Sequence, residues 1–166
     1  MIVEGINVVR ELLNSKSRID KVIAEESQNQ EIEEIVKLAN RNNVLVERVN
    51  KNQLERIAKT KTQGVIAFVP NFQYAELQDL FKLADSKGTK PFIVILDGIV
   101  DPHNLGAIIR TAECAGVDGV IIPENRAADI TDTVYKTSAG AVAHTAIVKV
   151  VNLTRTIDEL KKAGVW

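Results

Sequence analysis

The sequence is poor in the residues that build disulfides, zinc sites and membrane spans. It contains one cysteine and two histidines among 166 residues, which rules out an internal disulfide and a Cys/His zinc site. No apolar run approaches the ~20 residues that cross a bilayer. The N-terminal MIVEGINVVREL is acidic and amphipathic, unlike a secretory signal. We therefore expect a cytoplasmic protein without a metal or a membrane anchor.

A bias toward one sign of charge is also missing. The formal net charge is −1 at pH 7, so a nucleic-acid partner would have to meet a local basic patch. One candidate exists, with Glu47 and Glu55 as the nearest opposing charges. This basic patch consists of Arg48, Lys51, Arg56, Lys59 and Lys61. Two interpretations stay open, an RNA-binding surface or a solvated helix face and turn.

Hydrophobic periodicity predicts a small α/β unit over residues 1–70 and a linker over 71–90. The linker is less apolar and contains one expected helix, 76–84, before the breaker DSKGTKP. In the first unit, Asn52 is the expected cap of a short helix. The helices of that unit are expected over 3–13, 30–42 and 53–58, and its strands over 19–24, 44–49 and 64–70.

Residues 91–166 alternate strands and helices, which predicts right-handed crossovers and a parallel sheet. The run FIVIL at 92–96 is typical of a strand buried on both faces. Helices are expected over 105–115, 129–138 and 153–163, and strands over 117–122 and 146–150. The final KAGVW repeats the start of CAGVDGVII, so a further apolar strand is expected to start at Val165 and Trp166. We therefore expect a fragment or processed product whose sheet is incomplete.

The polar connection in LDGIVDPHNLGAIIRTAE holds the candidate site. Asn104 precedes the expected helix and is its expected N-cap. Arg110 lies off the apolar stripe, Gly106 removes bulk one turn before it, and Glu113 is spaced to pair with it. An arginine near a helix N-terminus suits phosphate or ribose binding, and a surface ion pair is the alternative. The stripe itself consists of Leu105, Ile108, Ile109 and Ala112.

Other chemistries have weaker support. The sequence has no GxGxxG after a strand and no GxxxxGK[ST], so a dinucleotide fold or P-loop is unsupported. Ser138 and His144 can be combined with an aspartate into a hydrolase triad, but no GxSxG motif accompanies them. His103 is a candidate general base or a solvent-facing residue. Cys114 lies opposite the apolar stripe, with no base predicted beside it.

The segment LDGIVDPHNLGAIIRTAECAGVDGVII resembles the first motif of the SpoU (TrmH) family of RNA ribose 2′-O-methyltransferases, within the SPOUT superfamily. EGINVVREL and TQGVIAF resemble the N-terminal substrate-binding domain of that family, and KTSAGA resembles its next landmark. Together these segments are similar to the branch that methylates a guanosine of 23S ribosomal RNA.

The resemblance implies an L30e-like RNA-binding domain over 1–70 and the first part of a methyltransferase domain over 91–166, whose C-terminus forms a trefoil knot in the family. It also implies S-adenosylmethionine as methyl donor, RNA as partner and a homodimer. Asn104, Arg110 and Glu113 match the polar residues of the first motif, and Gln63 of TQGVIAF joins the basic patch as a candidate RNA contact.

The second and third motifs of the family, which hold most of the cofactor pocket, do not occur in this sequence and are expected beyond Trp166. No cofactor-binding residue is therefore assigned, and we expect the chain alone to be inactive. An arginine has a pKa above ~12, which favours Arg110 as a stabiliser of the developing alkoxide over Arg110 as a base. Asn104 would orient Arg110 or the ribose. A non-catalytic RNA-binding module is the second hypothesis.

Overall fold

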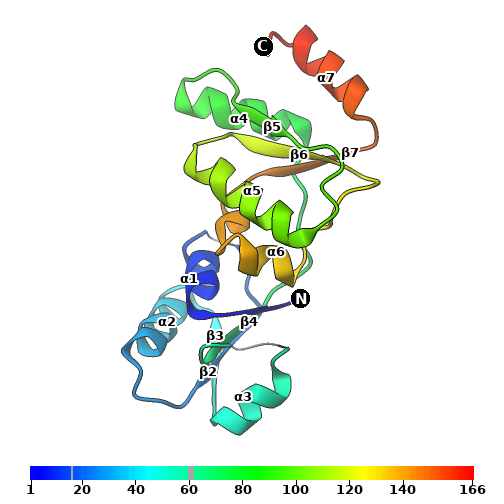
Figure 1. Ribbon diagram of the computed structural model, residues 1–166. Helices are drawn as coiled ribbons and strands as arrows, with labels where there is room; N and C mark the ends of the chain where they lie inside the picture. The colour runs from blue at the N-terminus through cyan, green and yellow to red at the C-terminus, as the bar shows by residue number, and fades with distance from the viewer. Residues whose placement is uncertain (16, 60–61) are drawn as a thin grey trace.

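The computed structural model describes residues 1–15, 17–59 and 62–166. The chain forms two α/β units, each built on its own sheet and arranged one after the other along a long axis (Figure 1). This confirms the predicted α/β class. In the described part of the chain, no helix is long and apolar enough to cross a membrane. The same residues contain no group of three or more acidic, His or Cys side chains placed to hold a metal ion.

The N-terminal unit has a four-stranded sheet in the order β1-β4-β2-β3. Only β2 and β3 pair in parallel; β4 is antiparallel to both of its neighbours. The strands are β1 (Ile2–Glu4), β2 (Lys21–Glu25), β3 (Leu45–Val49) and β4 (Val65–Phe68), and the helices are α1 (Ile6–Asn14), α2 (Gln30–Arg41) and α3 (Lys51–Ile57). Side chains alternate across the sheet, so that Val22 packs with α1 and α2 whereas Ile23 packs with Leu54 of α3.

The C-terminal unit has a parallel sheet in the order β5-β6-β7. Its strands are β5 (Ile93–Ile95), β6 (Gly119–Pro123) and β7 (Ile147–Val150). Its helices are α4 (Leu77–Lys87), α5 (Pro102–Cys114), α6 (Asp132–Thr137) and α7 (Leu153–Lys162), with the 3₁₀ turn η1 at Ala141–Ala143. Leu105 and Ile109 of α5 cover one face of the sheet. Leu80 of α4 and Leu160 of α7 cover the other, as a parallel sheet requires.

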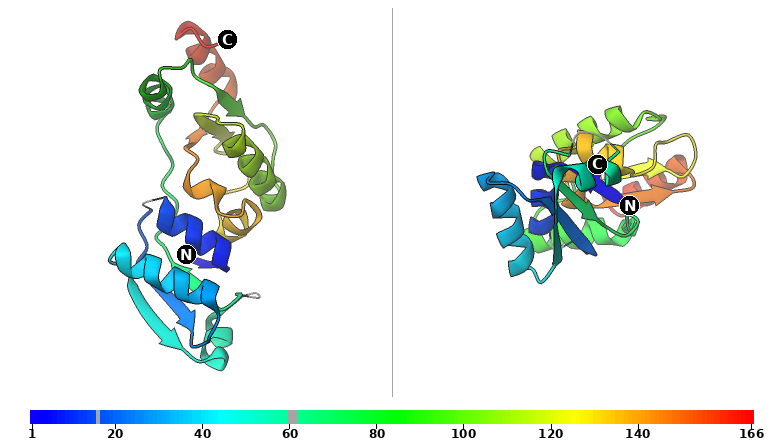
Figure 2. Two further views of the ribbon diagram at one scale, coloured as in Figure 1. Left: turned by 90° about the vertical axis from the view of Figure 1, so that its left-hand side faces the viewer. Right: turned by 90° about the horizontal axis from the view of Figure 1, so that it is seen from below.

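The two units share one buried core. In Figures 1 and 2, α1, α6 and η1 lie between the two sheets, and a single apolar cluster contains residues of both units. One salt bridge and one hydrogen bond join them as well. Lys59 Nζ lies 2.9 Å from Asp132 Oδ2, and His144 Nε2 lies 2.9 Å from Glu11 Oε2. The N-terminal unit is therefore fixed against η1 and α6 by both packing and charge.

The structure corrects several local predictions. Residues 2–4 form a strand that the sequence prediction missed, because Gly5, with φ of 105°, turns the chain before α1 starts at Ile6. Asn52 does not cap α3. Asn50 does so through a capping box with Gln53, which starts the helix two residues early.

The strand predicted from FIVIL was expected to be buried on both faces, and this was wrong. All of β5 is only half-buried, and Phe92 beside it is 51% exposed. β5 lies at the edge of its sheet and has a neighbouring strand on one side only. The apolar composition of FIVIL therefore did not predict how deeply the strand is buried. Helix α6 is shorter than predicted because it starts after Thr131. The other strands and helices named so far agree with the prediction to within a few residues, and the domain boundaries stay predictions.

The chain after α7 does not start the strand that KAGVW predicted. Gly164, with φ of 84°, turns the chain after the helix. Val165 packs against the apolar cluster that contains Leu160, whereas Trp166 is fully exposed. Neither residue pairs with a strand in the part of the chain that the structure describes. The prediction at Trp166 was therefore wrong, because an apolar pattern becomes a strand only where another strand supplies its backbone partners.

Candidate active site

The helix that carries the candidate residues starts earlier than the sequence indicated. Asp101 Oδ1 accepts a hydrogen bond from the His103 backbone N at 3.0 Å, so Asp101 is the N-cap of α5. Pro102 follows at the first helical position, where its missing N–H costs nothing. The prediction that Asn104 caps this helix was therefore wrong. Asn104 lies inside the first turn of α5, and its side chain is exposed.

Arg110 lies on the solvent side of α5, as the apolar stripe predicted. Leu105, Ile109 and Ala112 are buried, and Arg110 is exposed. Arg110 and Glu113 line a hollow of about 340 Å³, whose other lining residues are Glu11, Cys114, Ser138, Ala139, Ala141 and His144. Because Glu11 belongs to α1, this hollow is bounded by both units. We refer to it as the Arg110 hollow.

The predicted ion pair between Arg110 and Glu113 does not form. Among the described residues, Arg110 makes no salt bridge and no side-chain hydrogen bond. Nor does any hydrogen bond join Asn104 to Arg110 within the described ranges. Six residues along a helix place the two side chains about 120° apart around its axis. The guanidinium is therefore available to a ligand, and Asn104 does not orient it directly.

Gly106 has a different role from the predicted one. It is buried, and a Cβ at this position would lie 1.9 Å from Thr137 Oγ1 and 3.0 Å from the backbone N of Ser138. The missing side chain allows α6 to approach α5. It therefore does not leave space beside Arg110, and the predicted function of this glycine was wrong.

His144 lines the Arg110 hollow. The sequence suggested a role for this residue only as a member of a hydrolase triad. Its Nε2 contacts Glu11 Oε2 at 2.9 Å, and its side chain is 31% exposed in the Arg110 hollow. The proposed hydrolase triad fails, because Ser138 is fully buried. The Ser138 hydroxyl donates to the Tyr135 carbonyl at 3.2 Å and accepts from the Val142 N–H at 3.4 Å. Ser138 thus stabilises the turn that leads into η1. No sequence pattern links His144 to Arg110, and the fold alone brings them to the same hollow.

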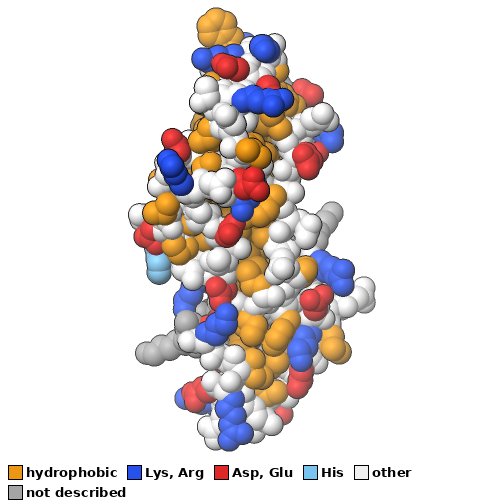
Figure 3. All heavy atoms as spheres, turned by 90° about the vertical axis from the view of Figure 1, so that its right-hand side faces the viewer, with side chains coloured by type: hydrophobic (Ala, Val, Ile, Leu, Met, Phe, Trp, Pro, Cys, Tyr) orange, Lys and Arg blue, Asp and Glu red, His pale blue; other side chains and the backbone are white. Residues whose placement is uncertain are grey.

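Two cations of the predicted basic patch, Arg48 and Lys59, are neutralised by carboxylates. Arg48 makes two contacts of 2.7 Å with Glu33, and the hydrogen bond from Arg48 lowers the pKa of the Glu33 carboxyl. The hydrogen bond to Asp132 raises the pKa of the Lys59 ammonium. Figure 3 shows Lys and Arg side chains interspersed with Asp and Glu along one face of the molecule.

The other patch residues differ in their surroundings. Lys51 Nζ lies 4.0 Å from Glu55 Oε1. Gln63 Oε1 accepts from the Ile6 N–H at 3.1 Å and thus caps α1. Lys61 lies outside the described residues. Arg56 is exposed at the end of α3 and has no salt bridge among the residues described. Arg56 is therefore the patch cation best available to an RNA.

Comparison with known proteins assigns both units. The model of the RNA 2′-O ribose methyltransferase substrate-binding domain matches residues 2–75, and that of the SpoU rRNA methylase family matches residues 91–166. A TrmH family tRNA/rRNA methyltransferase of Staphylococcus aureus (strain MSSA476) is 41% identical over 166 residues, which cover 99% of this chain and 67% of that protein. The chain belongs to the SpoU/TrmH family.

A second relative agrees with this SpoU/TrmH assignment, and two solved structures share the fold of the chain. The TrmH family protein YacO of Bacillus subtilis (strain 168) is 40% identical over 163 residues, 98% of this chain and 66% of its own length. The AdoMet-bound rRNA methyltransferase of Sinorhizobium meliloti has a TM-score of 0.73 at 25% identity, over 98% of this chain and 58% of that one. AviRb of Streptomyces viridochromogenes, in complex with AdoMet, has a TM-score of 0.75 at 17% identity, over 99% and 59%. The chain thus spans about two thirds of the curated relatives.

The described residues of this SpoU/TrmH chain do not by themselves enclose a cofactor. Ligands of open α/β sheets bind beyond the carboxyl ends of the strands, where β5 leads into residues 97–101. Val100 is 66% exposed there, and a Cβ on Gly98 would meet no atom within 4 Å. A segment this open makes at most one side of an adenosyl pocket. That other cofactor-binding residues follow Trp166 stays a prediction.

Proposed function

We propose that the protein containing this chain methylates a ribose 2′-hydroxyl of RNA with S-adenosylmethionine as donor. The observation that carries the proposal is the unpaired guanidinium of Arg110 in a hollow formed by both units. One of these units matches an RNA 2′-O ribose methyltransferase substrate-binding domain, and the other matches an rRNA methylase. The Arg110 guanidinium therefore lies where an RNA held by the substrate-binding unit would contact the methylase unit.

The charge of Arg110 defines its role. A guanidinium stays protonated at neutral pH, so Arg110 stabilises the negative charge that develops on the 2′-oxygen and holds the adjacent phosphate. Glu113, one turn further along α5, fixes the position of the guanidinium when RNA binds. Asn104 faces another side of the helix and contacts the ribose or its neighbour. When bound, S-adenosylmethionine supplies the activated methyl group.

The target that we propose is a guanosine of 23S ribosomal RNA, and the assembly is a homodimer. Both rest on the resemblance of the LDGIVDPHNLGAIIRTAE and KTSAGA segments to the branch with that substrate. The alternative of an RNA-binding module without catalysis depended on the basic patch. Since Glu33 and Asp132 neutralise two of its cations, that alternative loses its main support.

Arg110→Ala in the protein as its gene encodes it tests the proposal. We expect methyl transfer to ribosomal RNA to fall by about 10²–10³-fold, the effect of removing one oxyanion-stabilising donor. The free energy of unfolding should change by less than about 0.5 kcal/mol because Arg110 is an exposed side chain. Resistance of the product to alkaline cleavage at a single nucleotide identifies the 2′-oxygen as the acceptor.

Arg155→Ala is the matched control. Arg155 is also an exposed arginine, on α7, and pairs with Glu159 at 3.0 Å. Its loss should leave the rate unchanged. A methylation rate near that of the unmodified protein in Arg110→Ala would refute the role of Arg110. Methylation of a base instead of a ribose would refute the 2′-O assignment.

A further inference from the structure

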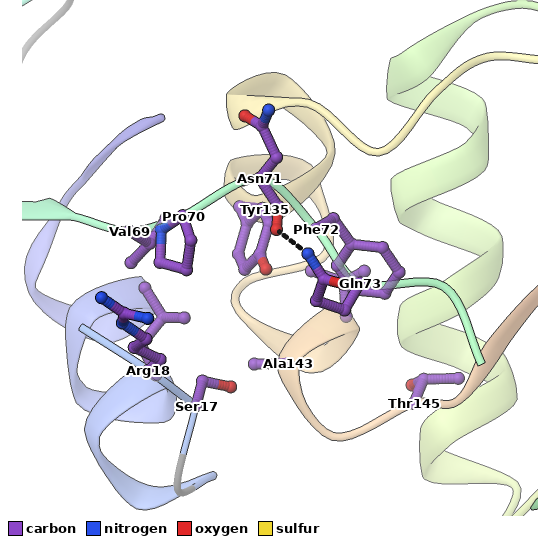
Figure 4. Close-up of a pocket in the computed structure, with 12 residues that line it drawn as sticks. Ser17, Arg18, Val69, Pro70, Asn71, Phe72, Gln73, Tyr135, Ala143 and Thr145 are labelled. Atoms are coloured by element: carbon purple, nitrogen blue, oxygen red, sulfur yellow. Dashed lines mark hydrogen bonds between the residues drawn. The ribbon is translucent and has the colours of Figure 1, made fainter. Parts of the chain in front are cut away.

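A second cavity, of about 260 Å³, lies at the junction of the two units and has no part in the proposed chemistry. Figure 4 shows it between the segment that leaves β4, the chain after α1, and the region of α6 and η1. Its polar lining residues are Ser17, Arg18, Asn71 and Gln73 from the N-terminal side and Tyr135 and Thr145 from the C-terminal unit. We call it the junction cavity. The matched substrate-binding domain, residues 2–75, supplies one side of it.

Tyr135 is a buried residue whose hydroxyl group is still open to the cavity. The residue is 5% exposed, and no hydrogen bond reaches its hydroxyl from any described residue. Figure 4 shows this hydroxyl directed into the junction cavity. Burial alone raises the pKa of the phenol. Because the hydroxyl is accessible from the cavity and has no partner among the described residues, it is available to donate a hydrogen bond to a molecule bound there.

Tyr74 makes the contrast clear. Its hydroxyl contacts Asp129 Oδ1 at 3.1 Å and accepts from the Ile130 N–H at 3.2 Å. It lies outside the residues that line the cavity. The two tyrosines both contact Phe72, with ring centroids 5.2 Å away for Tyr74 and 6.4 Å away for Tyr135. Only the tyrosine at the cavity keeps an unpaired hydroxyl.

The other groups at the cavity favour a planar heterocycle beside a phosphate. Gln73 Nε2 donates to the Asn71 carbonyl at 3.3 Å, which leaves Gln73 Oε1 and the Asn71 amide without protein partners within the described ranges. Arg18 is 82% exposed and lies 3.4 Å from Asp20. Side-chain amides read the edges of unstacked bases, and guanidinium groups bind phosphate. The cavity is smaller than the ~300–1,000 Å³ typical of drug-sized ligands, which suits a single base.

We propose that the junction cavity binds one unstacked nucleobase of the RNA substrate. The Tyr135 hydroxyl and Gln73 Oε1 contact the edge of the base, and Arg18 contacts the neighbouring phosphate. The proposal rests on the proposed action on RNA, and it adds a second RNA contact apart from Arg110. Such a contact would hold the strand across the junction of the two units.

The test measures binding of the four ribonucleoside 5′-monophosphates to the protein as its gene encodes it, by equilibrium dialysis. We expect saturable binding with a preference for one base, and we expect short single-stranded RNA to compete with it. Tyr135→Phe should weaken binding about fivefold, the effect of one lost hydrogen bond. Tyr74→Phe is the matched control and should leave the affinity unchanged, although it removes two structural hydrogen bonds.

Gln73→Leu is the second variant, since Gln73 is exposed and its substitution does not endanger the fold. It should weaken binding whether or not Tyr135→Phe is stable. The proposal is overturned if no mononucleotide binds, or if Gln73→Leu and a folded Tyr135→Phe both bind as well as the unmodified protein. Competition by free nucleotides but not by RNA would also overturn it, because the occupant would then be a free nucleotide.

Failure here is distinguishable from failure of the proposed function. Arg110→Ala should reduce methylation by about 10²–10³-fold and retain nucleotide binding. Nucleotide binding without any RNA methylation would support the cavity and refute the function. Methylation without nucleotide binding would support the proposed function and refute the proposal for the junction cavity.

Discussion

Gly140 and Glu11 lie closer together than any side chain at position 140 would allow. A Cβ atom on Gly140 would come within 2.6 Å of the Glu11 Cβ and 3.4 Å of the Val8 Cα. Glu11 also accepts the contact from His144 in the Arg110 hollow. One residue of α1 therefore packs against η1 and lines the candidate site. The docking of the N-terminal unit and the shape of the site depend on the same contact.

Gly140→Ala should destabilise the protein by more than backbone strain alone accounts for. Gly140 has φ of 89°, a region that costs other residues about 1–2 kcal/mol. The added Cβ would also force α1 away from η1. Gly116 is the matched control, because its φ is 77° and a Cβ there would meet nothing within 4 Å. Urea denaturation should give a loss for Gly140→Ala at least twice that for Gly116→Ala. Equal losses would mean that α1 can shift freely.

Gly106→Ala should reverse the usual order of helix propensity. Replacing glycine by alanine inside a helix normally stabilises it by about 1 kcal/mol. Here the new Cβ would lie 1.9 Å from Thr137 Oγ1, so the free energy of unfolding should fall. The reciprocal change at the next residue, Ala107→Gly, lies on the exposed side of α5 and should cost about 1 kcal/mol by propensity alone. Thermal denaturation of both variants checks this, and a rise in Tm for Gly106→Ala would contradict the packing role.

Local patterns in the sequence predicted most of the elements correctly. The apolar stripe of α5 placed Arg110 on the exposed side, because periodicity records which side of a helix meets the core. Errors arose where two signals competed. Asp101 and Asn104 are both good caps, and Pro102 at the first helical position decided for Asp101. FIVIL was apolar in composition, but its burial depends on its place at the edge of the sheet.

Long-range contacts could not be predicted from spacing. Gly106 meets Thr137, and Glu11 meets His144 across 133 positions of the sequence. The neutralisation of Lys59 by Asp132, in the other unit, is a contact of the same kind. The sequence identified the residue types of the candidate site, whereas the fold determined which of them share one hollow and which are already paired.

Asp118→Asn should reduce the amount by which the free energy of unfolding falls as the pH is lowered. Burial raises the pKa of this 3% exposed carboxyl, but the hydrogen bonds from Lys87 Nζ at 2.7 Å and from the Phe92 N–H at 2.8 Å lower it by more. A pKa lowered by folding contributes stability above the unfolded value of about 3.9, and this stability is lost as the pH falls through the lower folded value.

Urea denaturation over a pH series measures this slope. The unmodified protein should lose stability steadily below about pH 4, and Asp118→Asn should lose less over that range while being less stable at neutral pH. Asp158→Asn, at an exposed carboxyl of α7, is the control and should keep the original slope. An unchanged slope in Asp118→Asn would show that other carboxyls dominate the acid transition.

Arg56 should contribute more to RNA binding than Arg48, although both belong to the predicted basic patch. Arg48 is held by Glu33 through two contacts of 2.7 Å, so its charge is already compensated. Arg56 is exposed and has no ion pair among the described residues. Each phosphate contact changes the slope of log K against log salt by about 0.7–0.9. Arg56→Gln should therefore reduce that slope by about this amount, and Arg48→Gln should leave it nearly unchanged. Filter binding of ribosomal RNA over a salt series compares the two with the unmodified protein. A slope unchanged from the unmodified protein in Arg56→Gln would remove Arg56 from the RNA interface, and an equal reduction in both variants would refute the difference between Arg56 and Arg48.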